Sequence, residues 1–237
     1  MLYRDHGIVL RTWKLGEADR ILSFVTKGHG KVRAVAKGVR KTKSKFGGRL
    51  EPTAHVALQF YEGRELDIVT QAESVDQFAV FRTDVTRFGQ ASAMLEATDQ
   101  VAQEREPNPE LYHLLLGALR ALAASGGPLV VPAFFLKLLA LEGHRPMLDR
   151  CVECGAEDDL VAFSALDGGV LCVRCRRGVK LSPEALELLR QILGGRLGSA
   201  LNEPPGPATH EVSALATDTL EHYLERRLRS VSVVDTT

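Results

Sequence analysis

The first 75 residues alternate between apolar and polar positions with the period of two that is typical of half-buried strands. At residues 31–37, Val32, Ala34 and Ala36 fall on one face, while basic side chains share the other face with Val35. Four further short apolar runs, separated by turn residues, lie at residues 7–12, 20–26, 54–61 and 65–75. Five short strands predict a small barrel, for which the OB-fold is the five-stranded form. A simple antiparallel sheet is the alternative.

From about residue 80 the apolar positions recur at helical spacing, every three or four residues. Asn108-Pro109-Glu110 and Ser182-Pro183-Glu184 each combine an N-cap, a proline at the first helical position and an early acid, so helices are expected to start there. Pro132 opens another helix, which Gly143 can cap. Residues 202–209 are predicted as a proline-rich loop and residues 211–228 as the last helix. We interpret the apolar stripes of these helices as bundle core.

All four cysteines fall within 25 residues, as two Cys-X-X-Cys pairs separated by seventeen residues: Cys151, Cys154, Cys172 and Cys175. This is the spacing of a four-cysteine zinc site, in which a tight turn directs both sulfurs of each pair at one ion. Gly155 permits the positive φ that such a turn often needs. Two disulfides, a redox pair, unrelated buried thiols and an iron–sulfur cluster are the alternatives. Four thiolates leave no open coordination position, so one structural zinc ion is predicted.

Together these patterns predict an α+β protein. An N-terminal five-stranded OB-fold barrel is expected at residues 1–79 and an α-helical domain at residues 80–237. The cysteine region, residues 151–176, is expected as a zinc-binding element inserted in the helical domain.

The charge balance changes the picture, because a formal net charge of zero hides an uneven distribution. Residues 1–75 carry a net charge of +6, residues 76–150 carry −2, and residues 151–237 carry −4. Between residues 27 and 49 there are nine basic residues and no acidic one. Such asymmetry indicates a polyanionic partner for the N-terminal region.

The basic segment therefore supplies the candidate nucleic-acid site, because cations that contact phosphates provide most sequence-independent affinity. The candidate DNA-binding residues are Lys31, Arg33, Lys37, Arg40, Lys41, Lys43, Lys45 and Arg49. Phe46 lies among them and is a candidate for stacking on a base, with packing into the barrel mouth as its alternative role. Trp13 and Tyr61 are further aromatic candidates. No base-reading helix is evident, so we expect weak sequence specificity.

Catalytic signatures are missing from the sequence. The seven histidines are scattered, and HExxH, GxSxG, Walker A and GxGxxG motifs do not occur. We therefore expect a binding protein and not an enzyme. The N-terminus lacks the apolar run of a signal peptide, and no apolar stretch reaches the roughly 20 residues that span a bilayer. A cytoplasmic protein that does not bind a membrane is expected.

In the order of its features the sequence resembles the RecO family of bacterial recombination and DNA-repair mediators. The resemblance covers nearly the whole chain and rests on residues 7–10 with 16–20, 35–40 with 43–45, 50–52, 65–73, 108–112, 134–146, 151–155 and 168–175. Of these stretches, only the cysteine set is specific by itself. Some members of the family lack the cysteines, so the resemblance is to a zinc-bearing type.

The resemblance implies binding of single- and double-stranded DNA and annealing of complementary strands. It also implies RecR and single-stranded-DNA-binding protein as partners, with RecA loading as the outcome, in the bacterial cytoplasm at the nucleoid. An RNA- or ribosome-associated OB-fold protein and a zinc-ribbon enzyme that modifies nucleic acid are the alternatives.

Overall fold

The structure is a computed structural model, and it describes residues 1–230. The chain forms two compact units, one of Met1–Ala123 with Arg229 and Ser230, and one of Ala124–Leu228. The predicted domain boundary at residue 79 stays a prediction. The first compact unit includes the barrel and continues beyond it to Ala123. The end of the predicted helical domain, residues 231–237, lies outside the described residues.

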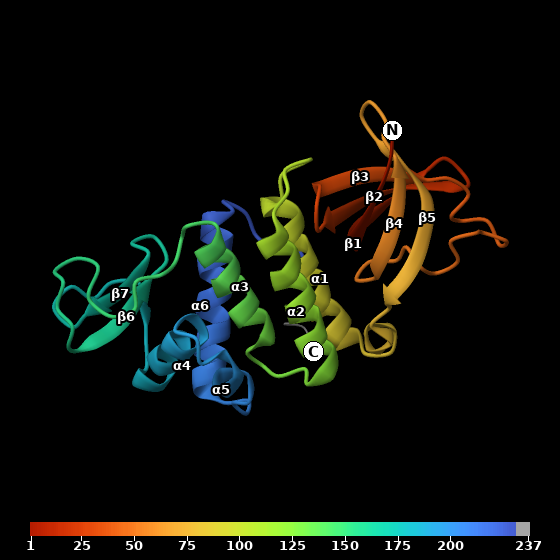
Figure 1. The fold of residues 1–237 in the computed structure, drawn as a ribbon. Coiled ribbons are helices and arrows are strands. Elements are labelled where there is room, and N and C mark those ends of the chain that lie inside the picture. The colour runs from red at the N-terminus through yellow and green to blue at the C-terminus, as the bar shows by residue number, and fades with distance from the viewer. Residues whose placement is uncertain (231–237) are drawn as a thin grey trace. The chain divides into compact units, whose positions relative to one another are not determined.

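Five strands close into a barrel with the order β1-β2-β3-β5-β4 (Figure 1). The strands are β1 (Leu2–Leu15), β2 (Asp19–Thr26), β3 (Gly30–Ala36), β4 (His55–Tyr61) and β5 (Asp67–Asp76). Their pairings are antiparallel except for β3 with β5, which is parallel. The barrel confirms the predicted OB-fold architecture, and the simple antiparallel sheet is wrong.

The inward positions of the predicted alternation form the barrel core. Val32, Ala34 and Ala36 of β3 pack there with Phe24 of β2 and Phe60 of β4, all at most 3% exposed. β1 is longer than the predicted run at residues 7–12, because its first half pairs with β4 and its second half with β2. The register shifts between Val9 and Arg11, a bulge of the kind that bends a strand around a barrel.

A short 3₁₀ helix, η1 (Ala79–Arg82), and two long helices, α1 (Val85–Val101) and α2 (Pro109–Ala124), belong to the same unit as the barrel. Asn108 is the predicted N-cap of α2, and its Oδ1 accepts a hydrogen bond from the backbone N–H of Leu111 at 2.9 Å. The start predicted for this helix is therefore confirmed.

The connection between α1 and α2 pairs with Lys31, the second residue of β3. The backbone N–H of Lys31 donates to the Gln103 carbonyl at 3.0 Å, and the N–H of Arg105 donates to the Lys31 carbonyl at 3.0 Å. Gly30 adopts φ +65°, and a Cβ there would lie 1.9 Å from the Glu106 carbonyl oxygen. Only glycine fits this close approach.

A buried polar contact also joins β4 to α2. His55 Nε2 lies 2.6 Å from the Tyr112 hydroxyl, and His55 is only 4% exposed. Burial lowers the pKa of His55 to about 4, so the imidazole is neutral near pH 7. This uncharged contact between His55 and Tyr112 holds β4 of the barrel against α2.

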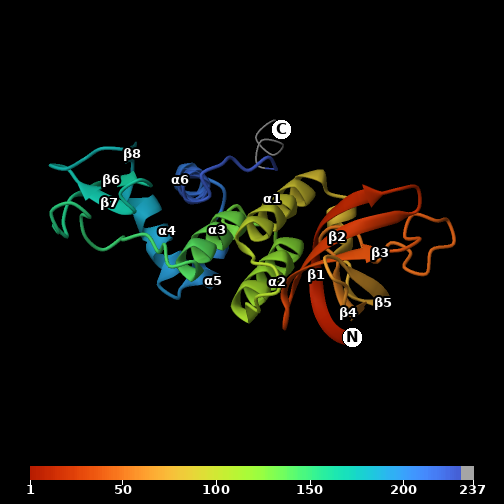
Figure 2. The same ribbon diagram turned by 90° about the horizontal axis from the view of Figure 1, so that it is seen from above.

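The second unit contains α3 (Val130–Leu141), α4 (Pro183–Leu193), α5 (Leu197–Leu201) and α6 (Pro207–Tyr223), with a three-stranded sheet in the order β7-β6-β8 (Figure 2). The strands are β6 (Leu160–Ser164), β7 (Gly169–Cys172) and β8 (Val179–Lys180). Gly143 has φ +84° directly after α3, as expected of its predicted capping role. Among residues 1–230, no helix is both long and apolar enough to span a membrane.

The last helix differs from the prediction for residues 211–228. It begins at Pro207, inside the predicted loop, and ends at Tyr223. Pro207 is its first residue, where a missing N–H costs nothing, and the Gly206 N–H donates to Thr209 Oγ1 at 2.9 Å. The prolines of this stretch thus start a helix as well as shape a loop.

Candidate nucleic-acid interface and metal centre

The basic residues gather on the connection between β3 and β4, which we call the basic loop (residues 37–49). Its base is fixed to the β1–β2 turn, because the Gly38 N–H donates to the Asp19 carboxylate at 2.7 Å and the Arg40 N–H donates to the Ala18 carbonyl at 2.9 Å. Farther along, Phe46 and Leu50 insert into the barrel core and are each 1% exposed. The loop is therefore attached to the barrel at both ends.

Six of the eight predicted DNA-binding residues lie on the basic loop and are exposed: Lys37, Arg40, Lys41, Lys43, Lys45 and Arg49. Their recorded side-chain hydrogen bonds go to neutral carbonyl oxygens, as from Arg40 to Gly16 at 3.2 Å and from Lys45 to Thr70 at 2.9 Å. Within residues 1–230 none of the six forms an ion pair with a carboxylate. Their positive charge is not compensated locally.

The other two predicted residues, Lys31 and Arg33 on β3, have acidic partners near the C-terminal end of α1. Lys31 Nζ lies 2.7 Å from the Asp99 backbone carbonyl and 3.9 Å from its carboxylate. Arg33 lies 3.6 Å from the Glu104 carboxylate. Asp99 also lies 3.6 Å from Arg11 of β1. The eight predicted cations thus divide into six without carboxylate partners and two with them.

Phe46 does not have the base-stacking role considered for it. Its ring is buried in the barrel core, and Lys45 Nζ lies over the ring at 4.9 Å from its centre. Burying an aromatic ring stabilises the fold by removing apolar surface from water, and the barrel mouth offers the space. Phe46 anchors the basic loop, so the packing alternative is the correct one.

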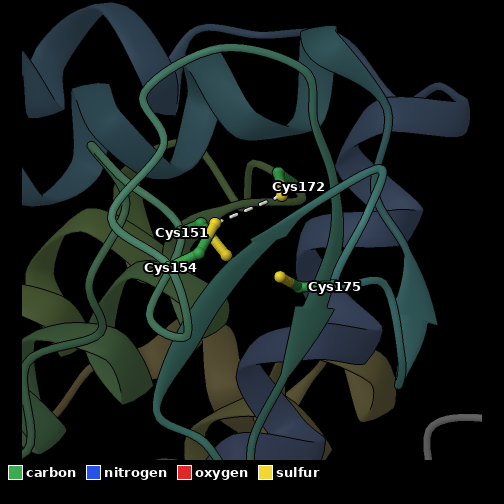
Figure 3. Close-up of side chains that lie close together, drawn as sticks. All are labelled: Cys151, Cys154, Cys172 and Cys175. Carbon is green, nitrogen blue, oxygen red and sulfur yellow. Dashed lines mark hydrogen bonds between the residues drawn. The ribbon is translucent and has the colours of Figure 1, made fainter.

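The four cysteines come together in the second unit. Cys151 and Cys154 precede β6, while Cys172 ends β7 and Cys175 follows it, and Figure 3 shows the four side chains directed toward one another. All four sulfurs lie within 4.8 Å of one another. All four are free thiols, and the recorded sulfur–sulfur approach, between Cys154 and Cys172, is 3.6 Å. A disulfide bond of about 2.05 Å is therefore not formed.

This geometry fits a tetrahedral metal ion. With bonds of about 2.3 Å, four thiolates around zinc lie roughly 3.8 Å apart, close to the 3.6 Å between Cys154 and Cys172 and within the 4.8 Å limit for all four. The turns are those expected of zinc knuckles: Gly155 has the predicted positive φ, +75°, and its N–H donates to the Cys151 carbonyl at 2.9 Å. Within residues 1–230 this is the one group of three or more His, Cys, Asp or Glu side chains placed to hold a metal.

The ionisation of the cysteines also suits a cation. Burial opposes ionisation of Cys151, but backbone N–H groups near its sulfur lower its pKa to about 6. Cys175 behaves oppositely, because its hydrogen bond to Cys154 and its desolvation raise its pKa to about 12. Four neighbouring sulfurs without a metal retain a proton, whereas a divalent cation would compensate the charge of all four thiolates.

An arginine connects the two cysteine turns with the hairpin between β6 and β7. Arg177 donates to both Asp167 oxygens, at 2.9 and 2.8 Å, and to Glu153 at 2.8 Å. This bond to Arg177 lowers the pKa of Asp167 to about 2. Arg177 thus compensates two of the carboxylates of the cysteine element.

The fold and the two sites define a class of protein: an OB-fold barrel that carries an uncompensated basic loop, followed by helices with an inserted four-cysteine metal centre. Residues 1–78 match the family described as Recombination protein O N terminal, and residues 82–232 match the family described as Recombination protein O C terminal. The chain belongs to the RecO family of DNA repair proteins. It is 46% identical over 246 residues to "DNA repair protein RecO" of Streptomyces coelicolor (strain ATCC BAA-471 / A3(2) / M145), with 99% of each chain covered.

Sequence reasoning missed the acidic partners of the strand cations and the role of Arg177. Asp99 is 68 positions from Lys31 along the chain, and only the packing of α1 beside the barrel brings them together. No local pattern indicates such a pair. Arg177 follows the last cysteine by two positions, and a charged residue there gave no distinctive signal.

Proposed function

We propose that this protein binds single- and double-stranded DNA through the basic loop, anneals complementary strands and acts as a recombination mediator. RecR and single-stranded-DNA-binding protein are its proposed partners, and RecA loading is the indirect outcome, in the bacterial cytoplasm at the nucleoid. The observation that carries the proposal is the set of six exposed cations without carboxylate partners. Membership of a DNA repair family and the name of the Streptomyces coelicolor relative support it.

The proposed mechanism is electrostatic. The basic loop neutralises phosphates on two strands at once and so reduces their mutual repulsion. Its cations are exposed and able to contact backbone phosphates without a defined base sequence. Because base edges remain uncontacted, two complementary strands held side by side are able to pair.

We further propose that the four cysteines hold one structural zinc ion. Zinc bound by four thiolates stabilises the fold of the cysteine element, because this segment is too small to build its own hydrophobic core. All four positions are then filled by protein, which leaves no site for water or substrate. We propose that the protein acts by binding and not by catalysis.

The test is a strand-annealing and binding assay with the purified full chain. We expect salt-dependent binding of a labelled oligonucleotide, with a log–log slope of roughly −0.7 per phosphate contact on single strands. We also expect faster pairing of complementary strands, including strands coated with single-stranded-DNA-binding protein. An added RecR protein should co-elute with the chain. Competition between RNA and DNA at fixed salt separates the RNA-binding alternative.

Two results would overturn the proposal. Absence of both DNA affinity and annealing would contradict the DNA-binding function, and preference for RNA would favour the RNA- or ribosome-associated alternative. For the metal, elemental analysis should find about one zinc per chain. Four titratable thiols with no bound metal in freshly purified protein would contradict the zinc site.

A further inference from the structure

The outer surface of β1, β2 and β3 carries an exposed aromatic side chain that the proposed function has not used. Strand pairing places Trp13, Ile21 and Val35 in one row across the three strands. The neighbouring row contains Arg11, Ser23 and Arg33. These positions alternate with the core residues of the same strands, so the rows face away from the barrel interior.

Trp13 is accessible on this surface. It is 37% exposed, and the Arg11 guanidinium lies 5.2 Å from the centre of its ring. Ile21 and Val35 beside it are half-buried and form an apolar border. α1 packs against β1 and β2. Asp99 of α1 pairs with Arg11, and Glu104 beyond the end of α1 pairs with Arg33. The indole is therefore exposed on β1 beside the Arg11 guanidinium.

The surface is continuous with the basic loop. Lys37 directly follows the end of β3 and lies two positions beyond Val35, roughly 7 Å further along the strand direction. The bond from Gly38 to Asp19 holds this point beside the turn that follows Trp13 on β1. A DNA backbone bound by the basic loop would therefore pass close to the indole.

We infer that Trp13 stacks on an unpaired base of single-stranded DNA whose phosphates the basic loop holds. This inference rests on the proposed function and adds to it a base-contacting site. Aromatic side chains that stack on bases are sequence-tolerant, since every base has a π face. In a duplex the bases are already stacked, so Trp13 adds affinity for single strands only. The exposed cations of the neighbouring basic loop favour a nucleic acid over an apolar protein partner as the occupant.

The first experiment uses fluorescence, because Trp13 is the one tryptophan of the sequence. The wild-type chain is titrated with a mixed-sequence single-stranded oligonucleotide, with the matching duplex, and with an abasic oligonucleotide of equal length. Stacking predicts quenching of the indole emission by the single strand. It predicts little change with the duplex or the abasic backbone, even where anisotropy of a labelled strand shows that they bind.

The second experiment compares Trp13→Ala, Trp13→Phe and the control Tyr61→Ala. Tyr61 is 50% exposed but lies on β4, outside this surface. Trp13→Ala should weaken single-strand binding roughly five- to 100-fold and duplex binding less than about twofold. Trp13→Phe should retain most of the affinity, and Tyr61→Ala all of it. The salt slope should be unchanged in all three, because stacking releases no counterions.

The outcomes distinguish this inference from the proposed function. Tight single-strand binding without quenching, together with an unaffected Trp13→Ala variant, would overturn the stacking site and leave the DNA-binding function intact. Loss of binding to a recombination partner protein in Trp13→Ala, with normal DNA affinity, would also overturn it, in favour of a protein-docking surface. Failure of the wild-type chain to bind any DNA would overturn the proposed function itself.

Discussion

The basic loop and the cysteine element both consist largely of turns, but they treat charge in opposite ways. The basic loop is fixed by apolar anchors, Phe46 and Leu50, and leaves its six cations without carboxylate partners. The cysteine element is organised around four sulfurs, and its Arg177 is held by two acids. Charges that are neutralised internally serve the stability of a segment, whereas uncompensated charges remain available to a partner.

Removal of the metal tests this contrast with the largest expected effect. Zinc contributes roughly 10 kcal/mol or more to the folding of zinc-finger peptides, so a strong chelator should unfold the cysteine element. Amide hydrogen exchange of residues 151–176 should become fast, while the oligonucleotide affinity of the basic loop changes less than about twofold. Unchanged exchange protection after complete metal removal would contradict a structural metal.

Removing the loop cations is the second test. Replacing Lys37, Arg40, Lys41, Lys43 and Lys45 with Ala should lower DNA affinity roughly 100-fold near 0.1 M salt. The salt slope on single strands should become shallower by up to about 3.5, because each lost contact removes about 0.7. Thermal stability should hardly change, since these side chains are exposed.

The matched control for the loop variant is Lys31→Ala with Arg33→Ala. These two cations come from the same basic run but have acidic partners, so their loss should weaken DNA binding much less. Equal effects of the two variants, or unchanged affinity in the loop variant, would contradict the prediction that uncompensated cations contribute more to DNA binding than compensated ones.

A third test removes the negative charge of Asp99, which compensates Arg11 and Lys31. Asp99→Asn preserves a hydrogen-bonding group for Ser23, which donates to Asp99 at 2.8 Å, but removes the charge beside Arg11 and Lys31. Ion pairs near a protein surface contribute about 0.2–1 kcal/mol, so DNA affinity should rise about 1.5- to fivefold, with a steeper salt slope. Anisotropy titrations at several salt concentrations measure both. A decrease in affinity would contradict the prediction that the Asp99 carboxylate lowers DNA affinity by compensating Arg11 and Lys31.

The smallest expected effect is in the cysteine element. Arg177 holds the pKa of Asp167 at about 2, below its ordinary value of 3.8. A lowered carboxyl pKa contributes stability above pH 3.8 that is lost as the pH falls toward 2. In Arg177→Gln the pKa of Asp167 should return toward 3.8, and this part of the acid sensitivity should disappear. An NMR titration of the Asp167 carboxyl measures the shift, with Arg174→Gln as a control in the same turn.

Local sequence patterns predicted those features that depend on neighbouring residues. The alternation in β3, the N-cap at Asn108 and the cysteine spacing each express a short-range requirement of backbone or metal geometry. Features that depend on tertiary packing were not predictable. Examples are the burial of Phe46 and the pairing of Lys31 with Asp99. The strands β6 to β8 were also missed, because runs of two to five residues are too short for periodicity to register.

The outer face of the barrel has a consequence for the choice of fragments in laboratory work. Ile8 and Val25 are 0% and 1% exposed, yet they are not part of the barrel core, and α1 packs against both of their strands. A fragment cut at residue 78 would expose this apolar patch and lose the partner of Lys31 as well as the contact between His55 and Tyr112. A truncation intended for crystallisation or isotope labelling should therefore keep residues 1–123, since the shorter piece is expected to aggregate.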